Sequence, residues 1–240
     1  MLSVCFYFLA VLFLPEIAPL ALLAPLSLWF KDIGTRKYQL ASFFALISTT
    51  TLALLLQQAH ILPGQFPSYL SHSEHWSLGQ VVVTIGQYIK LSVWPQPLSF
   101  VYGYNAVPFN GWLATNTVVA MTLIVSLVTT ALVFSSKKRL IGLGSLIFIV
   151  AILPVSNVLY PLEAQIVERG LLIPSIGMCL VMATLLVWLN KKVNSYIGGV
   201  IFILVLGGFS TLSFNRIAQW ADYETLIQAD VSNYPNSAPL

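Results

Sequence analysis

The sequence contains very few charged residues. They make up 8% of its 240 residues, whereas an ordinary globular domain carries about 25%. Hydrophobic residues account for 58% of the chain, and its mean hydropathy is +0.85. A chain with so little charge cannot cover an apolar interior with polar surface, so lipid must be the solvent for most of it. The composition therefore excludes a soluble domain and predicts an integral membrane protein.

Cysteine and histidine are also scarce. Cys5 and Cys179 both lie in apolar runs, which argues against a disulfide or a cysteine-based metal site. The three histidines share one polar region with Glu74, but their spacing matches no zinc pattern. The sequence also contains no glycine-rich phosphate loop and no Ser-His-Asp order. We therefore expect no metal ion, and these motifs assign no catalytic residue.

The positive net charge is concentrated at a few positions. The formal charge is +3, and eight of the eleven Lys and Arg residues lie in three short clusters within residues 31–37, 137–139 and 191–192. Short basic clusters beside apolar segments mark the cytoplasmic ends of membrane helices. We therefore interpret them as indicators of topology and expect no nucleic-acid partner.

Five apolar stretches have the length of about 20 residues that a membrane-spanning helix needs. They are residues 38–56, 113–134, 140–160, 171–190 and 196–214. Residues 1–30 are also apolar but contain three prolines, which predicts either one kinked helix or the end of one span followed by a second short one. We expect an all-helical transmembrane domain over residues 1–214, with six or seven transmembrane helices.

The segment at residues 78–94 is less apolar because it contains Gln80, Gln87 and Lys90. If it crossed the membrane, the basic clusters on either side of it would lie on opposite faces. We therefore expect an interfacial or re-entrant helix on the outer side. The alternative is a true span, with one basic cluster that does not follow the positive-inside rule.

The same topology places residues 57–111, 161–170 and 215–240 outside the cytoplasm. In the tail at 215–240, charged residues alternate with apolar ones, which predicts an amphipathic helix followed by a turn rich in Pro, Asn and Ser. Short loops and no recognisable targeting segment favour a bacterial inner membrane, with the C-terminus on the periplasmic side.

Charged side chains at the outer membrane edge are the first candidates for function, because such positions are costly unless they are used. Glu168 and Arg169 immediately precede the span that starts at residue 171, and Glu163 follows the preceding span. Arginine can offer a planar fork to a phosphate group; alternatively, Arg169 only pairs with a neighbouring glutamate. Lys90 is either another phosphate contact or an interfacial anchor.

Three segments, in order, resemble one known family. They are residues 87–104 (QYIKLSVWPQPLSFVYGY), residues 167–177 (VERGLLIPSIG), and the tail from residue 220 to residue 238. These segments are similar to the aromatic and Pro-rich loop, the Glu-Arg-to-Pro-Ser-Gly signature and the junction before the repeats in transmembrane, tetratricopeptide-repeat-containing O-mannosyltransferases. That family belongs to the GT-C glycosyltransferase superfamily. The signature departs from the family at Leu172 and Ile173, where relatives have a tyrosine.

The resemblance implies a GT-C-like fold and a transferase that moves a sugar from a polyprenyl-phosphate carrier to a protein hydroxyl on the outer face. It implies that Arg169 and Glu168 bind or orient the carrier phosphate, that Lys90 assists, and that Glu163 serves as an acidic helper. The family's catalytic carboxylates lie in an early outer loop that has no counterpart here. We therefore expect an incomplete fragment without that loop and without the helical repeats.

Two other classes of function remain open. One is a non-catalytic membrane anchor or scaffold for a helical-repeat domain, and the other is a transporter of lipid-linked sugar. The transporter has less support because the sequence shows no pair of broken helices in corresponding halves. The expected partners are the lipid bilayer, a polyprenyl-phosphate sugar and an acceptor protein.

Overall fold

The computed structural model describes residues 76–99, 102–103, 106–137, 139–158, 164–192 and 195–235, together with Tyr7, Ile47, Ser48 and Leu52. Within this part of the chain the structure is helical, and its one β-bridge pairs Tyr102 with Ile166. The all-helical prediction is therefore confirmed for the described residues. The predicted opening segment, most of the span at 38–56, and Glu163 lie outside them.

The first described helix, α4, spans Leu78–Val93, which agrees with the helix expected at residues 78–94. It begins with a capping box, in which Ser77 and Gln80 satisfy each other's backbone N–H groups. One of its faces is buried, and the helix packs mainly against α5 (Thr115–Lys137). The chain leaves α4 through a loop in which the Gln96–Pro97 peptide bond is cis.

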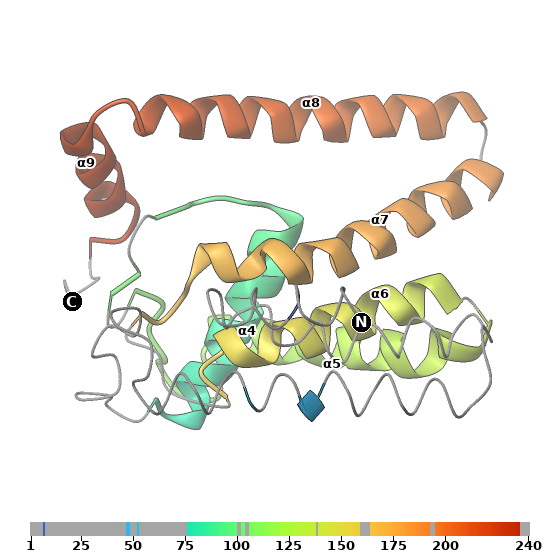
Figure 1. Cartoon of the computed structure of the whole chain (residues 1–240), viewed down its shortest axis with the longest axis horizontal. Coiled ribbons are helices and arrows are strands. Elements are labelled where there is room, and N and C mark those ends of the chain that lie inside the picture. The colour runs from blue at the N-terminus through green and yellow to red at the C-terminus, as the bar shows by residue number, and fades with distance from the viewer. Residues whose placement is uncertain are drawn as a thin grey trace.

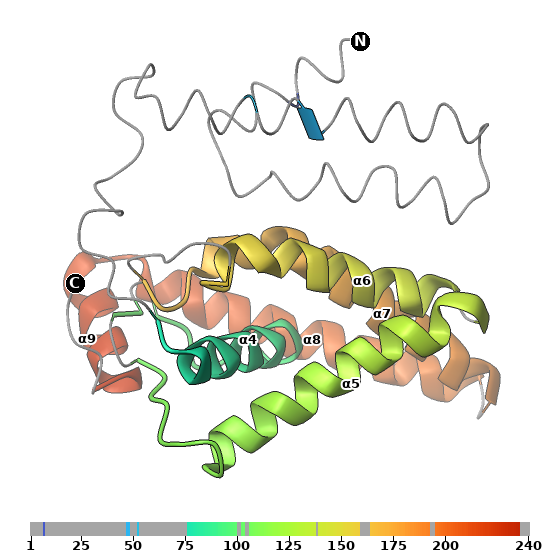
Figure 2. The same ribbon diagram turned by 90° about the horizontal axis from the view of Figure 1, so that it is seen from below.

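Four long helices follow one another in antiparallel order. They are α5, α6 (Arg139–Ile152), α7 (Leu172–Lys192) and α8 (Ser195–Gln219), and α4 crosses them obliquely (Figure 1). The contacts are densest between α6 and α7 and between α5 and α6. Figure 2 shows these helices side by side along the long axis of the molecule, with α9 at one end.

Three of the described helical segments are long and apolar enough to cross a membrane: Thr115–Val133, Glu168–Lys192 and Gly198–Gln219. They correspond to three of the five predicted spans. The chain is thus an integral membrane protein. The total of six or seven spans stays a prediction, because residues 1–75 lie almost entirely outside the described part of the chain.

The predicted span at residues 140–160 is shorter in the structure. Its α-helix ends at Ile152, and a 3-10 helix continues only over Leu153–Val155. Pro154 lies at the start of this 3-10 turn, where it cannot continue an α-helical hydrogen-bond ladder. Asn157 then adopts a left-handed backbone conformation with a φ of 62°, so the chain turns away from the helix axis.

The C-terminal tail also differs from its expected boundary. The helix α8 continues past residue 214 to Gln219, and the separate helix α9 spans Tyr223–Asn233. Residues 195–219 form one continuous, mostly apolar helix. Asp222 then adopts the extended backbone of an N-cap, and α9 begins after it. The tail therefore contains the end of one helix and a second helix, rather than one amphipathic helix.

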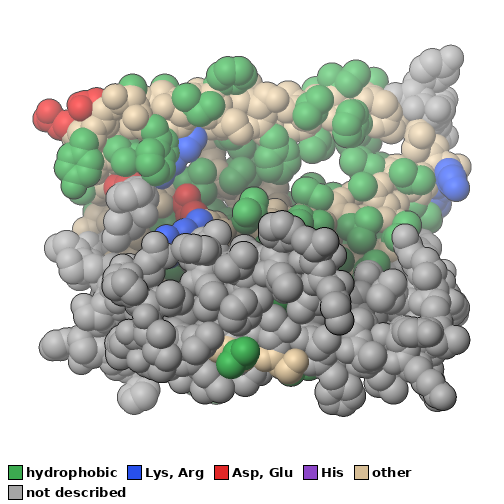
Figure 3. Space-filling view, in the orientation of Figure 1, with side chains coloured by type: hydrophobic (Ala, Val, Ile, Leu, Met, Phe, Trp, Pro, Cys, Tyr) green, Lys and Arg blue, Asp and Glu red, His purple; other side chains and the backbone are tan. Residues whose placement is uncertain are grey.

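The two ends of the helix bundle have different chemistry. The basic helix ends lie at one end of the bundle: α5 ends at Lys137, α6 begins at Arg139, and α7 ends with Lys191 and Lys192. The helix α9 and the loop after α4 lie at the other end (Figures 1 and 2). On the face shown in Figure 3, Lys and Arg side chains appear at both ends, whereas the acidic side chains gather at the α9 end. Beyond Gly198, the membrane-length part of α8 has no buried residues, so lipid is the natural cover for its apolar side chains.

The helices α6 and α7 approach each other closely at two glycines. A Cβ atom added to Gly177 would lie 2.4 Å from the carbonyl oxygen of Gly144, and one added to Gly144 would lie 2.6 Å from that of Gly177. Small residues allow such backbone approach between membrane helices. The glycine that ends the VERGLLIPSIG segment is therefore a packing residue.

Candidate functional site

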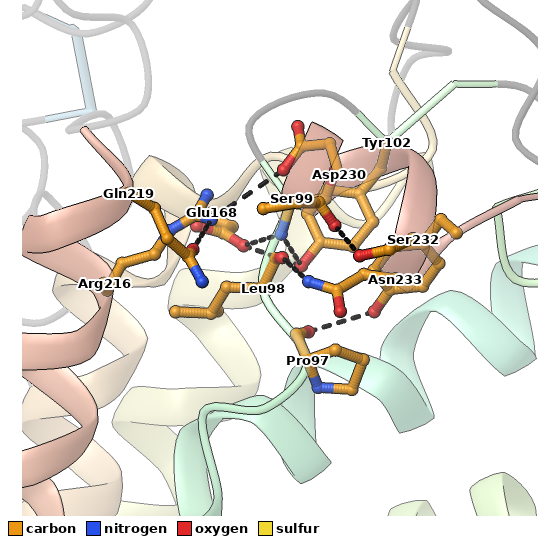
Figure 4. Close-up of polar contacts among 12 residues, drawn as sticks. Pro97, Leu98, Ser99, Tyr102, Glu168, Arg216, Gln219, Asp230, Ser232 and Asn233 are labelled. Atoms are coloured by element: carbon orange, nitrogen blue, oxygen red, sulfur yellow. Dashed lines mark hydrogen bonds and ion pairs between the residues drawn. The ribbon is translucent and has the colours of Figure 1, made fainter. Parts of the chain in front are cut away.

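The three segments that resemble one family meet in space, at the end of the bundle that also contains α9. The loop after α4 lies against the 3-10 helix Glu168–Leu171, and α9 ends beside the same loop (Figure 4). Buried and partly buried side chains from all three segments form one cluster there. This cluster is the candidate functional site.

The carboxylate of Glu168 is held inside the cluster by two hydrogen bonds. The hydroxyl of Tyr102 donates to its Oε1 over 2.6 Å, and the backbone N–H of Ser99 donates to the same oxygen over 3.0 Å. Hydrogen bonds to a carboxylate are among the stronger ones in proteins. Glu168 therefore holds the loop after α4 in one conformation, and its Oε1 oxygen points into the protein.

A second tyrosine joins the same two segments. Tyr88 is fully buried on α4; its hydroxyl donates to the carbonyl of Val155 over 3.0 Å and accepts from the N–H of Val167 over 2.7 Å. It therefore satisfies backbone groups at the end of one 3-10 helix and directly before another, which would be costly to bury unpaired.

Gln165 extends this hydrogen-bond network to the segment around Val107 and to Asn157. Its side chain is fully buried, donates to the carbonyl of Val107 over 2.7 Å and accepts from the N–H of the same residue over 2.9 Å. Asn157, the residue with the left-handed backbone, donates to the main-chain carbonyl of Gln165 over 3.1 Å. The irregular segments around the cluster are thus connected by buried side-chain amides.

Tyr102 and Tyr234 lie edge to face, with their ring centroids 5.0 Å apart. Burial, followed by the charge of Glu168, raises the pKa of Tyr102 far above its ordinary value, and burial also raises the pKa of Tyr234. Both hydroxyls therefore remain protonated at neutral pH and act as hydrogen-bond donors.

Two hydrogen bonds join the end of α9 to the loop after α4. Asn233 donates from its Nδ2 to the carbonyl of Leu98 over 2.9 Å (Figure 4). The hydroxyl of Tyr234 donates to the carbonyl of Pro97 over 3.0 Å. On the helix itself, Leu226 is buried. The loop is consequently held by Glu168 on one side and by α9 on the other.

A partly buried charge cluster lies between α8 and α9. Nη1 of Arg216 lies 3.8 Å from Oδ1 of Asp230 and donates to Oε1 of Gln219 over 2.7 Å. Only 14% of the Arg216 side chain and 16% of the Asp230 side chain is exposed. Glu168 is close enough to Arg216 for an electrostatic interaction. Nη2 of Arg216 is buried and has no hydrogen-bond partner among the described residues.

Two curated proteins are similar to parts of the chain. Protein O-mannosyl-transferase TMTC1 of Homo sapiens is 29% identical over 109 residues, and a protein O-mannosyl-transferase of Caenorhabditis elegans is 26% identical over 151 residues. The chain is a distant relative of protein O-mannosyl-transferases. These alignments cover 43% and 62% of the chain, but only 12% of the human protein and 21% of the nematode protein. No family model and no solved structure matches the chain.

The structure places the residues that were expected to bind phosphate in different environments. Glu168 is turned into the cluster, whereas Arg169 beside it is exposed. Lys90 is exposed near the end of α4, one turn before the loop that contacts Glu168. Glu163 lies outside the described residues. The structure therefore presents two cations, Arg169 and Lys90, on segments that adjoin the cluster.

Several residues of the cluster did not emerge from the sequence as functional candidates. Ser99, Tyr102 and Gln165 are ordinary polar or aromatic residues in loops, and their sequence neighbours do not indicate burial. Arg216 carried a signal, because it is a single cation at the end of an apolar run. The sequence pattern assigns Arg216 to an amphipathic tail, because periodicity does not show that α9 folds back onto the loop after α4.

Proposed function

We propose that this chain forms the membrane portion of a protein O-glycosyltransferase that takes a sugar from a polyprenyl-phosphate carrier and places it on a protein hydroxyl. The distant relationship to protein O-mannosyl-transferases is the observation that carries this proposal. The convergence of the three family-like segments in one cluster supports it, because separate segments that share a site must be close in space.

In this proposal, Arg169 and Lys90 bind the phosphate of the carrier. Both side chains are exposed, and an arginine fork can contact two phosphate oxygens at once. Glu168 orients the segment that contains Arg169, because its carboxylate is engaged by Ser99 and Tyr102. Glu163 would assist as an acidic group, and the catalytic base remains unassigned.

We further propose that the cluster faces the outer side of the membrane. The basic ends of α5, α6 and α7 lie at the opposite end of the bundle, and basic residues beside membrane helices favour the cytoplasmic side. The C-terminus would then be outside, where helical repeats would follow a GT-C-like membrane domain. The bacterial inner membrane stays a prediction.

The test is steady-state kinetics of the full-length protein in its membrane with a polyprenyl-phosphate mannose donor. Arg169→Ala should raise the KM for the donor by about tenfold or more, because a charge-assisted contact to the phosphate is lost. The matched control is Lys191→Ala, which removes an exposed cation at the other end of the bundle. Unchanged donor kinetics in Arg169→Ala would contradict the assignment.

The second candidate is a non-catalytic scaffold that presents a C-terminal domain. The hydrogen bonds of Asn233 and Tyr234 favour this candidate, because they hold the end of α9 against the membrane domain. A scaffold that retains the phosphate site would bind the lipid donor without transferring its sugar. Donor binding by the full-length protein, with no transfer to any acceptor peptide tested, would therefore favour this candidate over the transferase.

A further inference from the structure

A groove of about 320 Å³ lies between the loop after α4, the C-terminal end of α8 and the end of α9. Its volume is at the lower end of the range of about 300–1,000 Å³ found for small-molecule sites. Leu98 and Leu212 line it together with polar side chains, and Leu212 lies one helical turn closer to the middle of α8 than Arg216. The groove is therefore located where α8 leaves the apolar layer.

The polar lining of the groove is mostly uncharged. It consists of amide side chains and one guanidinium group: Gln96, Asn215, Gln219, Asn233 and Arg216. Each amide offers both donors and acceptors, which is the same combination that a sugar hydroxyl offers. Asn215 and Gln96 are exposed. An amide-rich lining of this kind suits a neutral ligand with several hydroxyl groups.

The charge balance argues against an anion in the groove. Among the described residues that line the groove, Arg216 is the only cation, and the carboxylates of Asp230 and Glu168 both lie near it. A phosphate beside Arg216 would be repelled by these two carboxylates, and the repulsion would offset its attraction to the guanidinium. A neutral hydroxyl group avoids this repulsion and can still exchange hydrogen bonds with the amide side chains of the lining.

We propose that this groove is a monosaccharide subsite, which binds the sugar ring of the lipid-linked donor through the exposed amides of Asn215 and Gln96. The inference rests on the proposed function but concerns a different group of the donor from that assigned to Arg169 and Lys90. In this arrangement the sugar ring lies between α8 and the loop after α4, and the phosphate of the donor contacts Arg169 and Lys90.

The first experiment uses the full chain in phosphatidylcholine nanodiscs, with methyl α-D-mannopyranoside and inorganic phosphate as separate probes. Saturation-transfer NMR should show contact with the mannoside ring protons, and any broadening of the inorganic phosphate signal in phosphorus NMR should not depend on Arg216. Asn215→Leu should weaken mannoside binding by about tenfold, since it removes hydrogen bonds from an exposed position without disturbing a packed core. Gln228→Leu, an exposed amide on α9 outside the groove, is the matched control.

A polyprenyl-phosphate mannose added to the nanodiscs should displace the mannoside, which identifies the sugar as part of the lipid donor rather than a free sugar. Phosphate broadening that depends on Arg216, or the absence of any mannoside contact, would overturn the proposal. Mannoside contact that is equal in the Asn215→Leu and control variants would also overturn it. If the mannoside measurements contradict the subsite while Arg169→Ala still raises the donor KM, the proposed function stands and only the sugar subsite is wrong.

Discussion

The hydroxyl of Tyr102 donates a 2.6 Å hydrogen bond to Oε1 of Glu168, and this bond joins segments that are 66 positions apart. The same carboxylate oxygen accepts from the N–H of Ser99, so a single oxygen holds the loop after α4. Glu168 therefore joins the 3-10 helix Glu168–Leu171 to the loop after α4. The exposed neighbour Arg169 remains the residue of this pair that can reach a ligand.

Replacing Tyr102 with phenylalanine should destabilise the protein by about 1.5–3 kcal/mol, the range for hydrogen bonds to charged groups. The ring and its packing are retained, but the carboxylate of Glu168 loses its shortest hydrogen bond. Unfolding in a denaturing detergent titration would measure the change. The control is Tyr223→Phe, because the Tyr223 side chain is 72% exposed. Equal stability of both variants would contradict the role assigned to the Tyr102 hydroxyl.

Gly177→Ala should weaken the packing of α6 against α7. The added methyl group would lie 2.4 Å from the carbonyl oxygen of Gly144, so the two helices must separate, at a cost of about 1–3 kcal/mol. Thermal unfolding in detergent would show a lower Tm. Gly199→Ala provides the contrast, since no described atom lies within 4 Å of its Cβ position. A Gly177→Ala protein as stable as Gly199→Ala would refute this close contact.

The double variant Asn233→Ala with Tyr234→Phe should release the end of α9. It removes the two hydrogen bonds to the carbonyls of Leu98 and Pro97, which together contribute about 1–3 kcal/mol. Limited proteolysis should then cut more rapidly at the turn around residues 220–222. Gln228→Ala, on the exposed face of α9, should leave the cleavage rate unchanged. If the double variant is cut at the original rate, these contacts do not hold the helix.

The two ends of α8 should be labelled from opposite sides of the membrane. At 25 residues the helix is about 37 Å long, which exceeds the hydrocarbon thickness of about 30 Å. In a chain with both native cysteines replaced by alanine, a cysteine introduced at Lys192 should react with a membrane-impermeant reagent only from the cytoplasmic side. A cysteine at Tyr223 should react only from the outer side. Labelling of both from one side would exclude a crossing by α8.

The sequence predicted the elements with the strongest local signal. Long apolar runs near residues 113–134, 171–190 and 196–214 must become helices in lipid, because only a helix satisfies its own backbone groups there. The segment at residues 78–94 was also predicted as a helix. The stop at Ile152 was missed because the surrounding residues are equally apolar, although Pro154 marks the place.

The candidate site was predicted only in part. Glu168 and Arg169 stood out as rare charges beside an apolar run, but their sequence positions could not show that one side chain is buried and the other exposed. Tyr102, Gln165 and Arg216 join the site through contacts between distant segments. No local pattern encodes such contacts.

The amino-acid sequence by itself determined that this protein lies in a membrane, because its composition leaves too few polar groups to face water. It also determined that its segments are helical, since backbone polar groups in lipid must be satisfied within the segment. Only the tertiary structure decided that the loop after α4, the segment after Val167 and the end of α9 form one site. The physical reason is that burial and hydrogen bonding depend on which segments meet, and Glu168 has its partners only after they have met.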